Sequence, residues 1–177
     1  MPETTSAGCE TREWAAPPDM PRFSVTRKSA FTPQQLYNVV ANIEAYPKFV
    51  PLCHAATLSD LRTDEAGHSH AYVVLHIQYD KLALAETLKC QVVFDASRLT
   101  IRSTSNRPPL KHLDGSWRFH ASPDGGCEVV YTVDYQLVSR SLQLLLSGMF
   151  DWAARKLLAA FEARAVELYG RPLARAS

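Results

Sequence analysis

Residues 31–53 of this 177-residue chain read FTPQQLYNVVANIEAYPKFVPLC, and they carry the clearest structural signals in the sequence. Thr32 is a favourable helix N-cap, Pro33 suits the first helical position, and Gln35 completes a capping box. Apolar residues then recur at helical spacing, at Leu36, Val39, Val40 and Ile43. The stretch therefore predicts a short amphipathic helix that begins at Pro33.

Two prolines, Pro47 and Pro51, are expected to end this helix, because a residue that precedes proline avoids helical backbone angles. The segment nevertheless stays apolar and aromatic, with Tyr46, Phe49 and Val50, where a loop is normally polar. We interpret it as a lid over a cavity. Such a lid would expose an apolar patch, which monomeric proteins rarely keep without a use.

Composition limits the classes to which the protein can belong. With 46% hydrophobic and 21% charged residues, the chain can form one domain with a full core. A formal net charge of +1 provides no overall field for nucleic acid. The sequence shows neither a membrane-spanning apolar run nor a secretory leader. Its four cysteines, Cys9, Cys53, Cys90 and Cys127, are scattered, so we expect a reduced, cytoplasmic location.

Several segments alternate apolar and polar residues with the period of a β-strand. Phe23 and Val25 mark the first, and the others lie within residues 71–79, 82–94, 113–121 and 127–137. This pattern predicts an antiparallel sheet with one covered face.

A long helix is predicted over residues 140–169, ended by Gly170 and Pro172. Its apolar stripe consists of Leu142, Leu146, Met149, Phe150, Ala153, Leu157, Phe161 and Leu168. The predicted fold class is α+β: a curved antiparallel sheet wrapped around this long C-terminal helix, with short helices after the first strand. Residues 1–20 are expected to be a disordered tail, 21–170 the folded domain, and 171–177 a C-terminal tail.

Three motifs resemble one known family. They are Tyr46-Pro-x-Phe49-x-Pro51-x-Cys53, then Trp117-Arg-Phe119, and the segment Ala160–Gly170. Together they are similar to the coenzyme Q-binding protein and RatA family of the START-like (SRPBCC, polyketide cyclase/dehydrase) helix-grip superfamily, over roughly residues 23–170. The resemblance implies a helix-grip fold that encloses a lipid-binding cavity.

The same resemblance implies ubiquinone or a related polyprenyl lipid as the bound ligand, with no other cofactor, no metal and no catalytic residue. The residues that we expect to bind it are Tyr46, Phe49, Val50, Pro51, Leu75, Ile77, Tyr79, Leu84, Glu86, Trp117, Phe119, Tyr131, Tyr135, Leu146, Met149, Phe150 and Ala153.

Passage of a polyprenyl tail through water is unfavourable, because exposing each isoprene unit to water costs roughly 4 kcal/mol. A carrier must therefore dock on a membrane, and we expect the lid to make that contact, helped by Lys48, Arg107 and Lys111. The expected location is cytoplasmic and peripheral, at the inner face of a bacterial inner membrane. Respiratory-chain or quinone-biosynthesis proteins are expected partners.

A few polar residues are candidates for a chemical role. Alternation places Glu86 on the apolar face, where a carboxyl group could donate a proton or bond to a quinone ring, unless an edge position exposes it. Cys53 is more consistent with a packed thiol than with a nucleophile. His68 and His70 form a potential metal pair, but they lie in a polar turn without a third ligand, and we interpret them as surface residues.

Three functions remain open. The favoured one is a non-enzymatic ubiquinone chaperone for respiratory electron transport or quinone biosynthesis. The second is a ribosome-associating translation inhibitor, a toxin of the RatA type, which would need a basic face such as Arg98, Arg102, Arg107 and Lys111. The third is an aromatase or cyclase enzyme, for which Glu86 is the visible acid–base candidate.

Overall fold

The structure is a computed structural model that describes residues 22–80 and 83–172. The predicted tail over residues 1–20, and most of the one over 171–177, lie outside the described residues. In chain order, the elements are β1 (Arg22–Ser29), α1 (Pro33–Ala41), the 3-10 helix η1 (Ile43–Lys48), β2 (Cys53–Thr63), β3 (Ser69–Tyr79), β4 (Leu84–Asp95), β5 (Thr100–Ser105), β6 (Leu110–Ala121), β7 (Cys127–Leu137) and α2 (Arg140–Tyr169).

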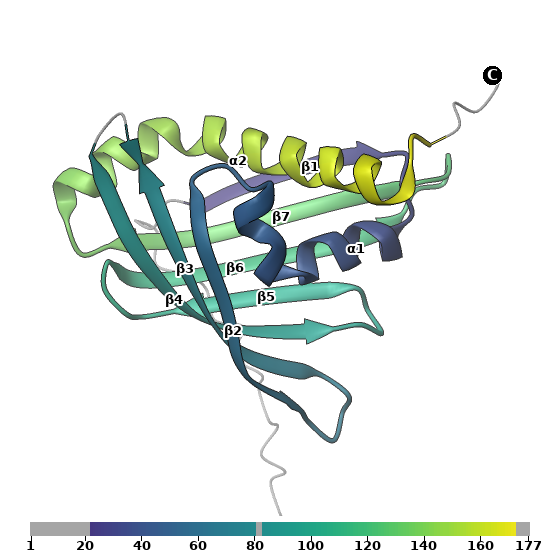
Figure 1. The fold of residues 1–177 in the computed structure, drawn as a ribbon, viewed down its shortest axis with the longest axis horizontal. Helices are drawn as coiled ribbons and strands as arrows, with labels where there is room; N and C mark the ends of the chain where they lie inside the picture. The colour runs from purple at the N-terminus through teal and green to yellow at the C-terminus, as the bar shows by residue number, and fades with distance from the viewer. Residues whose placement is uncertain (1–21, 81–82, 173–177) are drawn as a thin grey trace, which may run out of the picture.

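The seven strands form one sheet in the order β1-β7-β6-β5-β4-β3-β2, and every neighbouring pair is antiparallel. The sheet curves, and α2 runs along its concave side with α1 beside it (Figure 1). This arrangement confirms the predicted helix-grip class. The bounds of α2 agree with the prediction because Ser139 caps its start and Gly170, with φ of 76°, ends it.

The capping box of α1 is formed as predicted. Thr32 Oγ1 accepts a hydrogen bond from the backbone N–H of Gln35, and the Gln35 side chain accepts one from the N–H of Thr32. The helix ends earlier than the prolines suggested, at Ala41, and the chain continues in 3-10 geometry as η1 with Pro47 inside. The α-helix ends before either proline, at the C-cap Asn42, whose ψ of 67° is not helical.

Two strands were not predicted, β2 and β5. Strand β2 forms an edge of the sheet, and most of its side chains are at least partly exposed, so its sequence lacks clean alternation. Strand β5 has six residues, of which Ile101 is the fully buried one. Short or edge strands carry little hydrophobic pattern, because only part of one face is covered.

Burial divides α2 into two halves. Its fully buried residues are Ala154, Leu158, Phe161 and Ala165, which lie from the middle of the helix onward. Leu158, Phe161 and Ala165 pack with α1 and the sheet in the main core. The first half contributes Leu142, Leu146 and Phe150, which are only partly buried, to a smaller cluster around Val133 and Tyr135. Helix α2 is therefore anchored at its C-terminal half.

The β6–β7 turn packs closely against the end of strand β1 at Gly126. Gly126 has φ of 82°, and a Cβ there would overlap the backbone oxygen of Ser29 at the end of β1. Gly67 has a similar φ of 86°, but a Cβ there would meet no atom.

We expect Gly126→Ala to lower the free energy of unfolding by more than about 3 kcal/mol, because the backbone of β1 must move as well. Gly67→Ala, the matched control, should lose about 1–2 kcal/mol from backbone strain alone. Chemical denaturation of both variants gives the comparison. Equal losses would show that the contact with Ser29 is unimportant.

Candidate functional site

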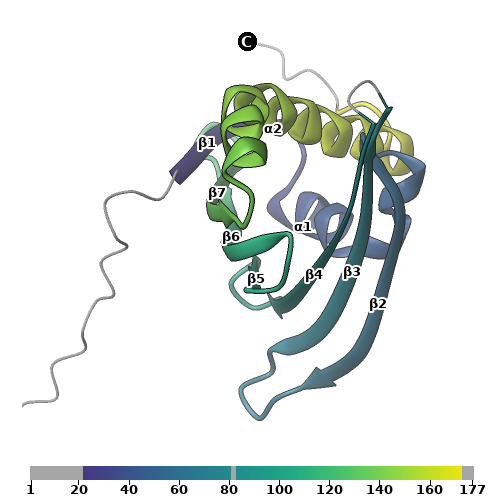
Figure 2. The same cartoon turned by 90° about the vertical axis from the view of Figure 1, so that its left-hand side faces the viewer.

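A cavity of about 410 Å³ lies between the concave face of the sheet and α2. Strands β3, β4, β6 and β7 supply its walls, α1 and η1 close one end, and the first half of α2 covers the other. Figure 2 looks onto that second end, where the first turns of α2 lie beside the β5–β6 turn. The volume falls within the roughly 300–1,000 Å³ typical of small-molecule sites.

The lining is apolar almost throughout. Aliphatic side chains predominate, and Trp117, Phe150 and Phe161 add aromatic surface. The polar groups are few: Glu86, Ser103, Lys156 and the phenols of Tyr46, Tyr79, Tyr131 and Tyr135. Such a surface suits a long apolar ligand with few polar atoms, because unpaired polar groups inside it would be costly.

Most of the residues predicted to bind a ligand line this cavity. They are Tyr46, Val50, Pro51, Leu75, Ile77, Tyr79, Leu84, Glu86, Trp117, Tyr131, Tyr135, Leu146, Met149, Phe150 and Ala153. The structure places them together; that they bind a ligand stays a prediction.

Phe49 and Phe119 are the two exceptions. The ring centroid of Phe49 lies 5.6 Å from that of Phe161 and 5.9 Å from that of Tyr46. Phe119 stacks on Trp117 and meets the edge of Tyr37. Both rings pack against other aromatic rings and do not line the cavity. Strand alternation and the family motif give no sign of this packing.

The lid is also more firmly packed than its sequence suggested. Tyr46, Phe49 and Val50 are half-buried against the core, so the expected exposed patch is not there. The hydroxyl of Tyr46 donates to the carbonyl of Val40 in α1, and the N–H of Gln78 donates to the carbonyl of Leu52 at 2.9 Å. These bonds fix the lid between α1 and β3.

Exposed apolar side chains gather elsewhere, on the turn before α2 and on its first half. Val138 is 62% exposed, Leu144 78%, Leu145 43% and Trp152 46%. We call these four residues the α2 apolar patch. Trp152 also lines the cavity, so the patch reaches the cavity itself.

Other lining residues escaped prediction. Ser103 lies on β5, which the sequence pattern did not show, and Pro109 lies on the following turn. Trp152 and Lys156 lie on the flank of the α2 stripe, which is wider than the predicted row. The sequence could have indicated these two residues, because they lie three or seven positions from Met149 or Ala153, on a neighbouring part of the same helix face.

The thiols in the wall are inert. Cys53 and Cys90 are both buried, and burial raises the pKa of Cys53 and raises that of Cys90 to about 11. Both therefore stay protonated near neutral pH, which supports the interpretation of Cys53 as a packed thiol. Burial also raises the pKa of Tyr131, so its phenol is neutral in the cavity.

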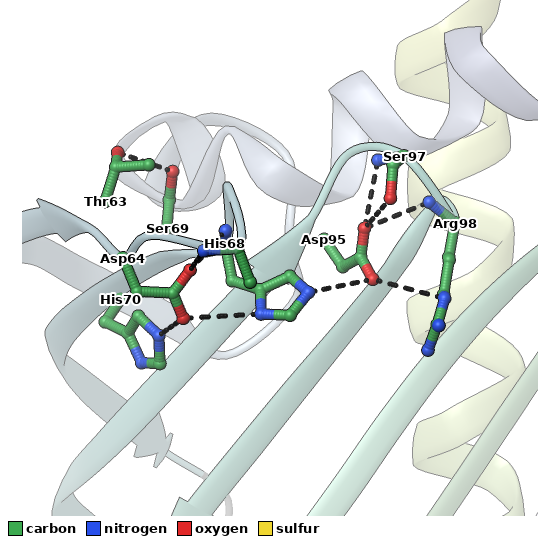
Figure 3. Close-up of polar contacts among 9 residues, drawn as sticks. Thr63, Asp64, His68, Ser69, His70, Asp95, Ser97 and Arg98 are labelled. Atoms are coloured by element: carbon green, nitrogen blue, oxygen red, sulfur yellow. Dashed lines mark hydrogen bonds and ion pairs between the residues drawn. The ribbon is translucent and has the colours of Figure 1, made fainter.

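His68, in the β2–β3 turn, and His70, at the start of β3, belong to a polar cluster (Figure 3), and neither lines the cavity. Nε2 of His70 lies 2.9 Å from the Asp64 carboxylate, and Nδ1 of His68 lies 3.3 Å from it. Nε2 of His68 then lies 3.4 Å from the carboxylate of Asp95. Within residues 22–80 and 83–172, no group of three or more His, Cys, Asp or Glu is arranged to hold a metal.

Asp95 ends β4 and is only 8% exposed. Its Oδ1 accepts hydrogen bonds from the backbone N–H groups of Ser97 and Arg98 at 3.0 Å and from the Ser97 hydroxyl at 2.6 Å. The hydrogen bond from the Ser97 hydroxyl, together with the backbone bonds and His68, lowers the pKa of Asp95. Through His68, the β2–β3 turn is thus attached to the β4–β5 turn, so these histidines have a structural explanation.

Acid should break this cluster. The hydrogen bond from His70, with that from the His68 backbone, lowers the pKa of Asp64 to about 2. Because both carboxyl pKa values are depressed in the folded state, their contribution is complete above the unfolded value near 4 and is lost as pH falls. We expect thermal stability to fall between about pH 4 and pH 2, and less steeply in Asp64→Asn. Parallel profiles for the two proteins would contradict this.

No helix within the described residues is long and apolar enough to cross a bilayer.

The comparison with protein families gives a match over most of the chain. The family described as "Polyketide cyclase / dehydrase and lipid transport" matches residues 29–162. Among solved structures, the chain is similar to the 18 kDa protein CC1736 from Caulobacter crescentus, with a TM-score of 0.73 and 32% identity. That similarity covers 86% of this chain and 100% of the other.

The curated relatives carry functional names of two kinds, toxin and coenzyme Q-binding protein. The chain is 24% identical to the ribosome association toxin RatA of Escherichia coli K12, over 85% of this chain and 90% of the relative. It is also 24% identical to the mitochondrial coenzyme Q-binding protein COQ10 of Dictyostelium discoideum, over 82% of this chain and 69% of the relative.

Proposed function

The chain belongs to the polyketide cyclase/dehydrase and lipid transport family, and from this premise we propose that it is a non-enzymatic binding protein for ubiquinone or a related polyprenyl lipid. In this proposal the lipid is its ligand, no further cofactor is needed, and the protein acts as a chaperone in respiratory electron transport or quinone biosynthesis. It would work as a peripheral protein at the inner face of a bacterial inner membrane.

The observation that carries the proposal is the apolar cavity under α2. Its volume of about 410 Å³ and its aliphatic lining suit a prenyl chain. Among the described lining residues Glu86 is the one carboxylic acid, and none is a histidine. An aromatase would need acid–base groups positioned on a polar substrate, so the lining favours binding over catalysis.

The relatives support the ligand class. The Dictyostelium relative is named for coenzyme Q binding, and the family name includes lipid transport. Apolar burial makes this chemically reasonable, because each isoprene unit contributes roughly 4 kcal/mol when it leaves water.

A substitution that fills the cavity tests the proposal. Ala153 faces the cavity from α2, whereas Ala159 is exposed on the same helix. We expect Ala153→Phe to fold normally and to weaken ubiquinone binding at least about tenfold, since each methylene-sized group that no longer fits loses about 0.8 kcal/mol.

Ala159→Phe, the same change on the outer face, should bind as the wild type does. Fluorescence titration with ubiquinone gives the affinities, and mass spectrometry of lipids that co-purify with each protein identifies the natural ligand. Equal quinone binding by Ala153→Phe and wild type would place the ligand outside the cavity and contradict the proposal.

A carrier must receive its lipid from a membrane, and the α2 apolar patch, rather than the lid, is suited to contact it. The patch adjoins the cavity through Trp152. The N–H of Val138 donates to the carbonyl of Pro109 at 3.0 Å, which brings the turn between Arg107 and Lys111 against the patch. Exposed apolar residues beside basic ones fit an anionic lipid surface.

We expect Leu144→Glu to reduce association with phosphatidylcholine–phosphatidylglycerol vesicles about tenfold or more, because a buried Leu contributes about 1.5–3 kcal/mol. Leu61→Glu is the matched control, since Leu61 is 62% exposed on the edge strand β2, which is away from the patch. Vesicle co-sedimentation measures both. Unchanged association of Leu144→Glu would show that another face meets the membrane.

The RatA relative supports ribosome association as a second candidate function. Against it, two arginines of the proposed basic face are paired: Arg102 with Asp114, and Arg98 with Asp95. Pairing reduces the local positive potential that ribosomal RNA would require. Sedimentation of the protein with purified ribosomal subunits distinguishes the two functions.

A further inference from the structure

The hydroxyl of Tyr135 is buried without a hydrogen-bond partner. Tyr135 lies on β7, is 4% exposed, and lines the cavity. Within the described part of the chain, its hydroxyl oxygen is the one buried side-chain oxygen or nitrogen of a non-exposed residue that has no partner. Buried polar groups in proteins are nearly always bonded, so this exception points to a role.

The described residues around Tyr135 offer no hydrogen-bond partner for its hydroxyl. Its ring stacks on Phe150, with centroids 4.7 Å apart and planes at 18°. The cluster around it consists of Leu110, Val133 and Leu137 with further apolar residues. Phenylalanine would keep this packing and avoid the cost of an unpaired hydroxyl. The hydroxyl therefore contributes nothing to the fold that a phenyl ring would not.

The other polar groups of the lining are less specific. The Tyr46 hydroxyl is already bonded to the carbonyl of Val40. Tyr79, Glu86, Ser103 and Tyr131 are only partly buried, and Lys156 is exposed. Tyr135 alone combines full burial, a position in the lining and an unused hydrogen bond.

We propose that the Tyr135 hydroxyl donates a hydrogen bond to an oxygen of the ligand's headgroup, such as a quinone carbonyl. This inference rests on the proposed function, and it assigns the polar recognition point within that site. A phenol is a good donor to a carbonyl oxygen, and the apolar surroundings strengthen the bond.

The proposal also orients the ligand. Tyr135 and its partner Phe150 lie under the first half of α2, near Leu142 and Leu146. The opposite end of the cavity is lined by Val40, Ile43 and Phe161 and by Tyr46, whose hydroxyl already donates to the carbonyl of Val40. The headgroup therefore lies under the first half of α2, and the tail extends toward α1.

The test compares two probes that share a ring and an alkyl tail: decylubiquinone, which has carbonyl oxygens, and dodecylbenzene, which has none. We expect Tyr135→Phe to weaken decylubiquinone binding about three- to tenfold, the range for one neutral hydrogen bond. Its affinity for dodecylbenzene should match the wild type, and the melting temperature of the ligand-free variant should not fall. The control is Tyr37→Phe, a buried phenol outside the cavity, which should bind both probes normally.

Two outcomes would overturn the inference: unchanged decylubiquinone affinity in Tyr135→Phe, or an equal loss for both probes, which would mean that the hydroxyl acts through packing. Failure of the wild-type protein to bind decylubiquinone at all would instead overturn the proposed function, so the two failures are distinguishable.

Discussion

A curved sheet of seven strands presents more apolar surface on its concave face than one helix can cover, and this mismatch governs the structure. The fully buried residues of helix α2 lie from its middle onward, at Ala154, Leu158, Phe161 and Ala165. Small residues at two of these positions allow the helix to approach the core. Its first half is less deeply buried and contacts the sheet through residues such as Phe150, which stacks on Tyr135, and the cavity lies beneath this half. The cavity is thus a consequence of where the helix is anchored.

This arrangement separates stability from binding. The capping box of α1 and the Asp64–His68–Asp95 link hold elements around the cavity from outside its lining, whereas Tyr46 of the lid both lines the cavity and bonds to α1. The cavity wall itself contains few polar groups, so its residues contribute mainly shape and apolar area. We infer that substitutions in the wall can change ligand preference with little loss of stability, provided that their volume suits the space.

Local signals in the sequence predicted the parts of the fold that local interactions determine. The cap at Thr32, the start and end of α2 and the alternation of β3, β4, β6 and β7 follow from neighbours in the chain. Strand β5 and the inward packing of Phe49 depend instead on contacts between distant segments, such as Phe49 with Phe161. Alternation indicated that Tyr135 faces inward, but the absence of a partner for its hydroxyl depends on every residue around it.

A carrier must release what it binds, and this requirement explains why a neutral phenol suits the recognition point. Burial of the tail is about as favourable in a bilayer as in the cavity, so moving the tail between them changes the free energy little. The contact with the headgroup then decides how strongly the ligand prefers the cavity to the bilayer. A hydrogen bond between neutral groups contributes about 0.5–1.5 kcal/mol, a factor of roughly 2 to 12, whereas one to a charged group contributes about 1.5–3 kcal/mol. A buried charge would thus retain a quinone for longer, whereas in the proposed carrier role a neutral phenol such as that of Tyr135 would select a carbonyl and still allow release of the lipid to a membrane.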